Sequence, residues 1–223
     1  MAEGKVKAVL FDVGGVIAGN LHWFEGTEEL CDAEALEAMG KVRKEEWMKL
    51  KTDEGYGVQT FWENVLKAGG LEGKRTWQEM DAKLQEGFRV FDSTVQVIRQ
   101  LRAKGYIVGV ISNHSHEWFN GIFDRYDVHA EFPDQALVIV SCYARCAKPD
   151  KAIFTHAWNR LQAKYPDLRP NEVVFVDDQE RNAEACREHV GWHTIHFNVE
   201  VQDPSTLTAG LAALGITDLT HGA

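Results

Sequence analysis

Short apolar runs rich in β-branched residues recur along this chain of 223 residues, and they constrain its fold more than any other feature. Each run has the length of a single strand. Near-continuous apolar runs of this kind are typical of strands that are buried on both faces of a parallel sheet. The runs lie at 6–11, 107–111, 137–140 and 173–176, with a weaker one at 194–197.

Helical patterns separate these runs. Ser93 is predicted to cap a helix that stops at Gly105, and Pro149 is predicted to open another. Strands that alternate with helices indicate an α/β fold. We therefore expect a Rossmann-like, doubly wound parallel sheet.

The segment 18–91 departs from this alternation, because it shows helical spacing and no convincing strand. We predict an all-helical cap inserted at 18–91, and a Rossmann-like core formed by 1–17 and 92–223. Aromatic residues at helical spacing, such as Trp47 and Trp62, are expected to pack in the core between the helices.

The charge composition argues against a nucleic-acid partner, since 24 basic and 34 acidic residues give a net charge of −10 without any basic run. The chain also lacks a stretch of about 18 consecutive apolar residues and an apolar leader. We expect no membrane association and a cytoplasmic location. Four scattered cysteines fit reduced thiols better than disulfides. The oligomeric state does not follow from the sequence.

Three of the apolar runs end abruptly in polar residues. Asp12 follows the first, Ser112 and Asn113 follow the second, and Asp177 and Asp178 follow the fourth. In an open parallel sheet these positions are carboxyl ends of strands, where ligands bind. The sequence therefore predicts that these side chains meet in one crevice.

The residue types in this crevice suit phosphoryl transfer. Asp12 can serve as a carboxylate nucleophile that forms an aspartyl phosphate. Asp12 and Asp178 offer hard oxygen ligands for Mg2+. Ser112 can donate a hydrogen bond to a phosphoryl oxygen, and Lys148, in the segment CAKPD, supplies a fixed positive charge.

The order of these segments resembles the haloacid dehalogenase superfamily. VLFDVGGV looks like its first motif, VISN its second, the lysine of KPD its third and VVFVDDQERN its fourth. The forms FD-x-GGV and DD-x-x-x-N are similar to the branch that contains small sugar phosphatases and the phosphatase domain of soluble epoxide hydrolases. The resemblance implies a Mg2+-dependent phosphatase that acts on a small phosphorylated metabolite, such as a sugar phosphate.

The resemblance also implies roles for individual residues. Asp12 would be the nucleophile, assisted by Ser112 and Lys148. The metal would be held by Asp12, the backbone carbonyl of Gly14 and Asp178. The residues that would support the metal site are Asp177 and Asn182, and those assigned to substrate binding are Gly15, His22, Asn113 and His114.

One position departs from the pattern. Superfamily phosphatases usually carry a second aspartate, the general acid and base, where this chain has Gly14. His22, His114 or His116 could supply the proton instead. Two alternatives remain open: a catalytically weak ligand-binding or scaffold protein, and a haloacid dehalogenase. The dehalogenase is disfavoured because those enzymes need no metal and carry neutral residues in place of the acidic pair at 177–178.

Overall fold

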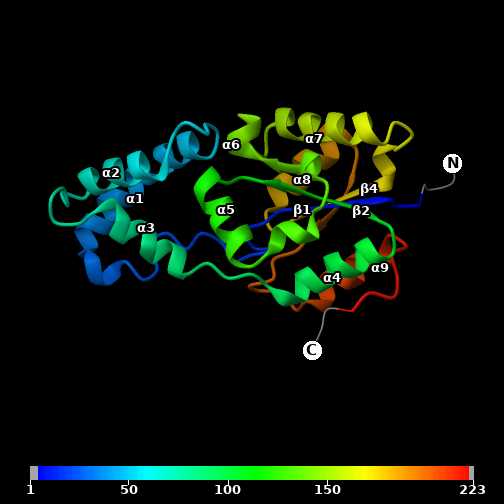
Figure 1. Ribbon diagram of the computed structural model, residues 1–223, viewed down its shortest axis with the longest axis horizontal. Coiled ribbons are helices and arrows are strands. Elements are labelled where there is room, and N and C mark those ends of the chain that lie inside the picture. Colours follow the sequence, from blue (N-terminus) through cyan, green and yellow to red (C-terminus); the bar gives the residue numbers. More distant parts are fainter. Residues whose placement is uncertain (1–4, 221–223) are drawn as a thin grey trace.

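Five parallel strands form the central sheet of the computed structural model, in the order β3-β2-β1-β4-β5 (Figure 1). The structure describes residues 5–220. The order reverses direction between β1 and β4, and such a reversal opens a crevice at the carboxyl ends of the two strands. All predicted strands are confirmed, with ends shifted by one or two residues. They are Ala8–Phe11 (β1), Ile107–Ser112 (β2), Val138–Val140 (β3), Val173–Asp177 (β4) and His193–His196 (β5).

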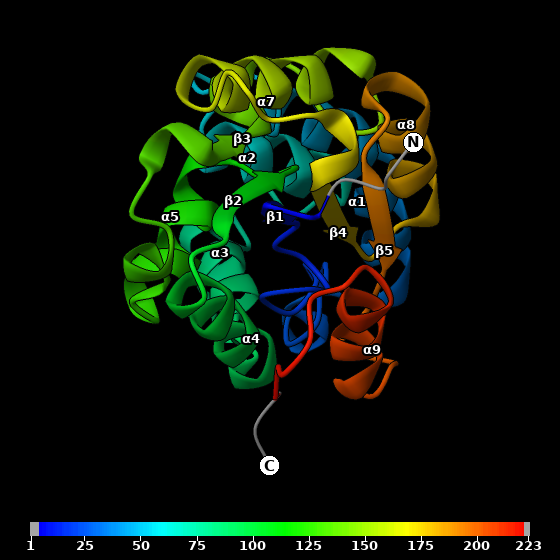
Figure 2. The ribbon, with the colours of Figure 1, turned by 90° about the vertical axis from the view of Figure 1, so that its right-hand side faces the viewer.

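Helices cover both faces of the sheet, which explains why the strands are apolar throughout. Successive residues of a strand point to opposite faces, so Val9 and Phe11 pack in one hydrophobic cluster and Ala8 and Leu10 in another. Figure 2 shows the pair α4 and α9 on one side of the sheet and the pair α7 and α8 on the other. These helices are Asp92–Ala103 (α4), Lys151–Lys164 (α7), Glu180–Val190 (α8) and Ser205–Ala213 (α9).

The start of α4 differs from the prediction. Phe91, rather than Ser93, occupies the N-cap position, so the predicted cap is wrong. The reason is tertiary: the backbone N–H of Phe91 donates to the carbonyl of Ile17 at 2.9 Å, which fixes the chain one residue before the helix begins. The predicted stop is confirmed, because Gly105 takes a φ of +83° just beyond the helix.

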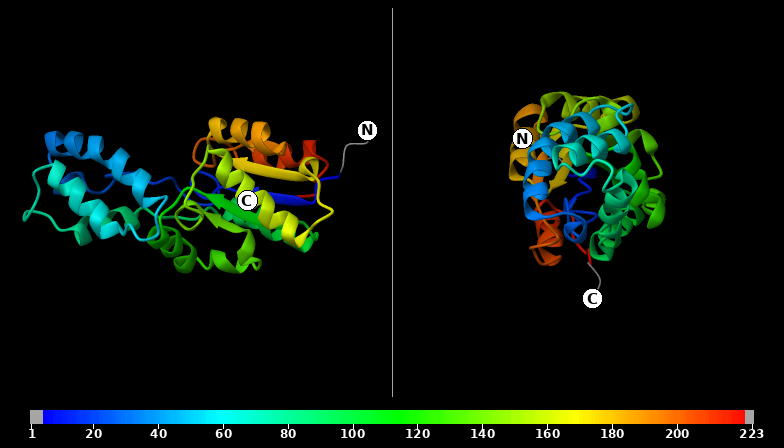
Figure 3. Two further views of the ribbon diagram at one scale, coloured as in Figure 1. Left: turned by 90° about the horizontal axis from the view of Figure 1, so that it is seen from above. Right: turned by 90° about the vertical axis from the view of Figure 1, so that its left-hand side faces the viewer.

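Three α-helices and a short 3-10 helix lie between β1 and α4, and the α-helices lie beyond the carboxyl ends of the strands (Figures 1 and 3). We call α1 to α3 the helical extension: Ala33–Leu50 (α1), Val58–Ala68 (α2) and Trp77–Glu86 (α3). Ala18 and Val90 form an isolated antiparallel bridge where the chain leaves and re-enters the sheet region. This arrangement agrees with a helical insertion, while the domain limits at 18 and 91 stay a prediction.

The helical extension is tied to the sheet region by an aromatic cluster around Trp118 of α5 (His116–Arg125). The rings that surround Trp118 are those of Trp23, Trp47, Phe61 and Trp62. Asp81 of α3 lies beside this cluster and is buried. Its Oδ1 accepts hydrogen bonds from Nε1 of Trp118 at 2.7 Å and Nε1 of Trp62 at 3.2 Å. One carboxylate therefore satisfies two buried indole N–H groups from both sides of the junction.

Two further expectations concern the chain as a whole. Within residues 5–220, no helix is both long and apolar enough to span a bilayer. The cysteines are free thiols, as predicted: Cys31, Cys142, Cys146 and Cys186. The cytoplasmic location stays a prediction.

Asp81→Ala should lower the free energy of unfolding by about 2–4 kcal/mol, because it leaves two buried indole N–H groups without an acceptor. Urea denaturation followed by tryptophan fluorescence measures the change. Asp81→Asn is the matched control, since its carbonyl oxygen can still accept, and it should cost less than half as much. Equal costs for both variants would show that the hydrogen bonds do not hold the junction together.

Candidate active site

Three carboxylates meet where β1 and β4 end. Strand pairing places Phe11 beside Val176, and the backbone N–H of Asp12 donates to the carbonyl of Val176 at 2.8 Å. One oxygen of each of Asp12, Asp177 and Asp178 lies within 4.8 Å of the others, and all three residues are buried. For the three carboxylates, the predicted meeting in one crevice is confirmed.

Lys148 is inserted among the carboxylates and is itself buried. Its Nζ lies 2.8 Å from Oδ2 of Asp12 and 2.7 Å from Oδ2 of Asp177. Burial raises the pKa of Asp12, and the charge of Lys148 opposes that rise. Burial likewise raises the pKa of Asp178. For Lys148, burial works against the charged form, but Asp12 and Asp177 outweigh it and raise its pKa.

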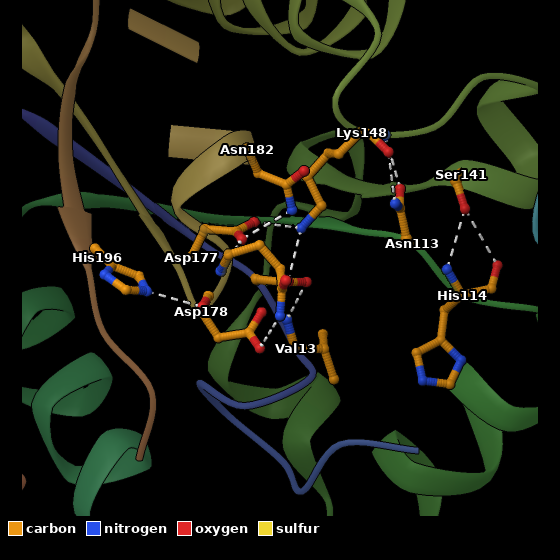
Figure 4. A network of polar contacts seen from close by, with 11 residues as sticks. Val13, Asn113, His114, Ser141, Lys148, Asp177, Asp178, Asn182 and His196 are labelled. Atoms are coloured by element: carbon orange, nitrogen blue, oxygen red, sulfur yellow. Dashed lines mark hydrogen bonds and ion pairs between the residues drawn. The ribbon is translucent and has the colours of Figure 1, made fainter. Parts of the chain in front are cut away.

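The backbone of Lys148 is fixed by Asn113. The side-chain N–H of Asn113 donates to the carbonyl of Lys148 at 2.9 Å, and the N–H of Lys148 donates to Oδ1 of Asn113 at 2.8 Å (Figure 4). The amide thus uses both of its functional groups to hold the lysine in register with β2. Asn113 also lines the cavity described below, and its role in substrate binding stays a prediction.

The start of α8 holds the acidic pair. Oδ1 of Asp177 accepts from the backbone N–H of Gln179 at 2.8 Å and from Nδ2 of Asn182 at 2.9 Å. Oδ2 of Asp178 accepts from Nε2 of Gln179 at 2.7 Å. Nε2 of His196, on β5, donates to the backbone carbonyl of Asp178 at 2.9 Å (Figure 4). Nothing in the sequence pattern indicated His196, because its proximity depends on the pairing of β5 with β4.

Three polar atoms near the carboxylates are buried without a hydrogen-bond partner among the described residues. They are Oγ of Ser112, Oδ1 of Asn182 and Nδ1 of His114. A buried polar atom left unpaired costs about 1–3 kcal/mol. His114 and Asn182 line the cavity described below, so their unpaired atoms face a space that a ligand could occupy, whereas Ser112 does not line it. The position of Ser112 at the end of β2 agrees with its predicted role.

The two glycines after Asp12 serve different purposes. Gly15 has a φ of +70°, and a Cβ there would lie 2.8 Å from Cβ of Asp178, so its backbone packs directly against that carboxylate. Gly14 does not have a positive φ, and a Cβ there would meet only Oδ1 of Asn20, at 3.1 Å. Gly15 was assigned to substrate binding, but the structure places it beneath the metal-binding candidate Asp178.

A cavity of about 360 Å³ opens beside the carboxylates, between the sheet and the helical extension. Trp47 packs in the aromatic cluster around Trp118, as expected, and also contributes to the cavity wall, whereas Trp62 is fully buried. The predicted site residues that line the cavity are Asp12, Gly14, Asn113, His114, Lys148, Asp178 and Asn182. Those that do not are Gly15, His22, Ser112 and Asp177.

His22 lies apart from the cavity wall. Its Nε2 is 3.0 Å from Oε1 of Glu200, and its Nδ1 is 3.4 Å from Oε2 of Glu25. Glu200 also accepts from the side-chain amide of Asn20 at 2.8 Å, and Asn20 itself lines the cavity. A direct contact of His22 with substrate stays a prediction that the geometry does not support.

Two cationic residues of the cavity wall were missed by the sequence interpretation. Lys51 follows the last residue of α1, and Arg181 lies in the first turn of α8. Arg181 falls within the segment VVFVDDQERN, so its neighbourhood was a signal that could have found it. Lys51 carries no such signal, because only the packing of the helical extension brings it to the cavity.

Comparison with known proteins identifies the class. A family model of haloacid dehalogenase-like hydrolases matches residues 6–189, and the chain belongs to this hydrolase family. It is also 33% identical over 124 residues to Acyl-CoA dehydrogenase family member 10 of Mus musculus. That match covers 56% of this chain and 10% of the relative, so the chain spans about a tenth of the relative's length.

Solved structures share the fold at low sequence identity. A HAD family enzyme of Bacteroides thetaiotaomicron, in complex with magnesium and inorganic phosphate, has a TM-score of 0.61 and 20% identity, covering 91% of this chain and 98% of that one. A HAD-like family hydrolase of Porphyromonas gingivalis has a TM-score of 0.66 and 22% identity, covering 92% and 97%. L-2-haloacid dehalogenase of Xanthobacter autotrophicus has a TM-score of 0.60 and 16% identity, covering 96% and 85%.

Gly15→Ala should destabilise the protein by about 1–3 kcal/mol, because the new methyl group meets Asp178 and the backbone keeps a positive φ. Chemical denaturation measures the loss. Gly14→Ala is the matched control, since its methyl group meets only the end of the Asn20 side chain, and it should cost less than half as much. A larger cost at position 14 than at 15 would contradict the roles described here.

Proposed function

We propose that this protein is a Mg2+-dependent phosphomonoester hydrolase in which Asp12 accepts the phosphoryl group of a small phosphorylated metabolite. The observation that carries the proposal is the buried group of Asp12, Asp177 and Asp178 around the single ammonium of Lys148. This group lies at the carboxyl edge of the sheet, beside a cavity large enough for a small ligand.

The charge of this group supports a divalent cation. Three carboxylates and one ammonium leave two negative charges in a buried place, and a divalent cation would neutralise them. Oxygen ligands are those that Mg2+ prefers. The residues that would hold it are Asp12, the carbonyl of Gly14 and Asp178. When bound, Mg2+ would offset the charge of the phosphate and so allow a carboxylate to approach it.

Asp177 is better suited to support the metal site than to bind the metal ion directly. Both of its oxygens already accept hydrogen bonds, from Lys148 on one side and from Gln179 and Asn182 on the other. These contacts fix the position of the lysine and the start of α8. The magnesium and phosphate in the structure of the Bacteroides thetaiotaomicron enzyme of the same fold support the proposal of a magnesium-dependent phosphate site.

The nucleophile is oriented by two donors. The backbone N–H of Val13 donates to Oδ1 of Asp12 at 2.7 Å, and Lys148 binds Oδ2. A carboxylate oxygen of Asp12 would attack phosphorus, the ester oxygen would leave, and water would then hydrolyse the aspartyl phosphate. Lys148 and the unpaired hydroxyl of Ser112 would stabilise the charge on the phosphoryl oxygens.

The leaving oxygen has no evident proton donor. Asn20 lies against Gly14, where the second aspartate would project. Burial lowers the pKa of His114 to about 4, so its imidazole is neutral near pH 7 and is a poor acid. His22 is held by Glu200, and His116 is exposed beside Tyr143. We therefore infer that the departing oxygen leaves with little assistance.

The same observation favours a second candidate, a ligand-binding protein of the family with weak catalysis. Loss of general acid catalysis commonly lowers a rate by about 10²- to 10⁴-fold. Dehalogenase chemistry is less well supported, because the carboxylates of Asp177 and Asp178 would repel the carboxylate of a haloacid. Turnover of a chromogenic phosphate ester with and without Mg2+ separates these possibilities.

Asp12→Asn should abolish phosphatase turnover while leaving the fold intact, because the amide is nearly isosteric but is not a nucleophile. Hydrolysis of p-nitrophenyl phosphate measures activity, and circular dichroism tests the fold. Wild-type activity should disappear with EDTA and return with Mg2+. Undiminished turnover of the variant would overturn the nucleophile assignment, and full activity after chelation would overturn the metal requirement.

The rate of hydrolysis of aryl phosphates should depend steeply on the pKa of the leaving phenol, because no nearby acid relieves the charge of the departing oxygen. A series of substituted phenyl phosphates under single-turnover conditions measures this slope without interference from later steps. Gly14→Asp combined with Asn20→Ala should flatten the dependence, since the second change makes room for the new carboxyl. A flat slope in the wild type would mean that another residue supplies the proton.

A further inference from the structure

Two cations of the cavity wall, Lys51 and Arg181, take no part in the chemistry described above. Lys51 comes from the end of α1 in the helical extension, and Arg181 comes from α8 beside the sheet. Within residues 5–220, neither side chain has a carboxylate within ion-pair distance or a hydrogen-bond acceptor. By contrast, Lys49, two residues earlier, is paired with Glu46 at 2.7 Å.

Lys51 is unusual because it is buried without a counter-ion. Only 9% of the residue is exposed. Burial lowers the pKa of its ammonium, and the charges of Arg181 and then Lys148 lower it further, while Asp150 offsets part of the effect. A buried, unpaired charge is costly, and one way for a protein to retain it is to pair it with a ligand.

The packing around Lys51 offers only weak compensation. Its Nζ lies 5.9 Å from the centroid of the Trp47 ring, which is near the outer limit of a cation–π contact. Its position after the last turn of α1 is favourable for a cation. Each of these two effects stabilises a cation only weakly. An anion in the cavity would compensate the charge more fully.

Lys51 and Arg181 line the same cavity as Asp12 but take no part in the contacts that hold it. The carboxylate of Asp12 is paired with Lys148, whereas Lys51 and Arg181 have no ion-pair partner among residues 5–220. The charges of Arg181 and then Lys148 act on Lys51, so one cavity holds three cations, of which two are not committed to a carboxylate. Trp23 and Trp47 add aromatic surface to the wall of this cavity.

We propose that Lys51 and Arg181 bind a second anionic group, a carboxylate or a phosphate, on the substrate whose phosphoryl group is transferred to Asp12. This inference rests on the proposed function, and it narrows the substrate class to small phosphomonoesters that carry another anion. A cavity of about 360 Å³ accommodates a molecule of that kind. A carboxylate or phosphate accepts well from both a guanidinium and an ammonium.

The test compares ligands that differ by one anionic group. Phosphoglycerate is paired with glycerol phosphate, and glucose bisphosphate with glucose monophosphate, so that the two pairs distinguish a carboxylate from a phosphate. Affinities are measured by titration calorimetry with Mg2+ in the Asp12→Asn protein, which does not hydrolyse the ester. In at least one pair, the ligand with two anions should bind at least about tenfold more tightly than its partner.

Lys51→Met and Arg181→Met, introduced separately, should each reduce that affinity ratio by about tenfold. Lys49→Met and Arg187→Met, on the same two helical segments but outside the cavity wall, are matched controls that should keep the ratio. A ratio near one in the parent protein would overturn the proposal. So would an unchanged ratio in Lys51→Met, or equal weakening of both members of a pair, because the cations would then serve the transferred phosphate.

Thermal unfolding without ligand gives an independent readout. If the ammonium of Lys51 serves to bind a ligand, the melting temperature of Lys51→Met should be no lower than that of the wild type. The substitution keeps an apolar stem and removes the unpaired charge. A clear fall in melting temperature would assign the ammonium a structural role and overturn the proposal. Failure of the wild type to hydrolyse p-nitrophenyl phosphate with Mg2+ would instead count against the proposed function, while the affinity ratio still decides the anion subsite.

Discussion

The ion pairs of Lys148 with Asp12 and Asp177 are the interaction on which the rest of the site depends. Without the ammonium, buried carboxylates that follow two adjacent strands would repel one another. Removing one partner of such a buried group is commonly more costly than the group itself is stabilising. Asn113 therefore forms hydrogen bonds with the backbone of Lys148. Asn182 and the start of α8 form hydrogen bonds with Asp177. Each of these contacts fixes a charge before any ligand arrives.

The sheet and the helical extension contribute differently to the cavity. The strands place charges that suit phosphoryl transfer at a fixed edge, since parallel register allows little freedom there. The helical extension adds Trp47 from α1 and Lys51 just after it to the wall of the same cavity. Its attachment through Trp118 and Asp81 determines where these two residues lie. Under the proposed function, substrate choice would thus be separated from the chemical step, in agreement with the general separation of sites from the folds that carry them.

Gly14 shows why family membership alone does not define the chemistry of this chain. The fold and the hydrolase family are shared with enzymes of low sequence identity. Yet the position where a second carboxylate would stand is occupied by the side chain of Asn20, which is itself held by Glu200. The presence of glycine at position 14 is therefore linked to the neighbouring contact between Asn20 and Glu200. Restoring the carboxylate requires space as well as charge.

The sequence by itself determined the five strands, their parallel pairing and the gathering of Asp12, Asp177, Asp178 and Lys148 at one edge. It could do so because buried strands are continuous apolar runs, and the residues that follow them necessarily reach the same edge of a sheet. Only the tertiary structure decided that Phe91 caps α4, that His22 is paired with Glu200 away from the cavity, and that Lys51 and His196 approach it. These positions depend on how the helical extension and β5 pack, and packing between segments distant in the chain leaves no periodic signal in the sequence.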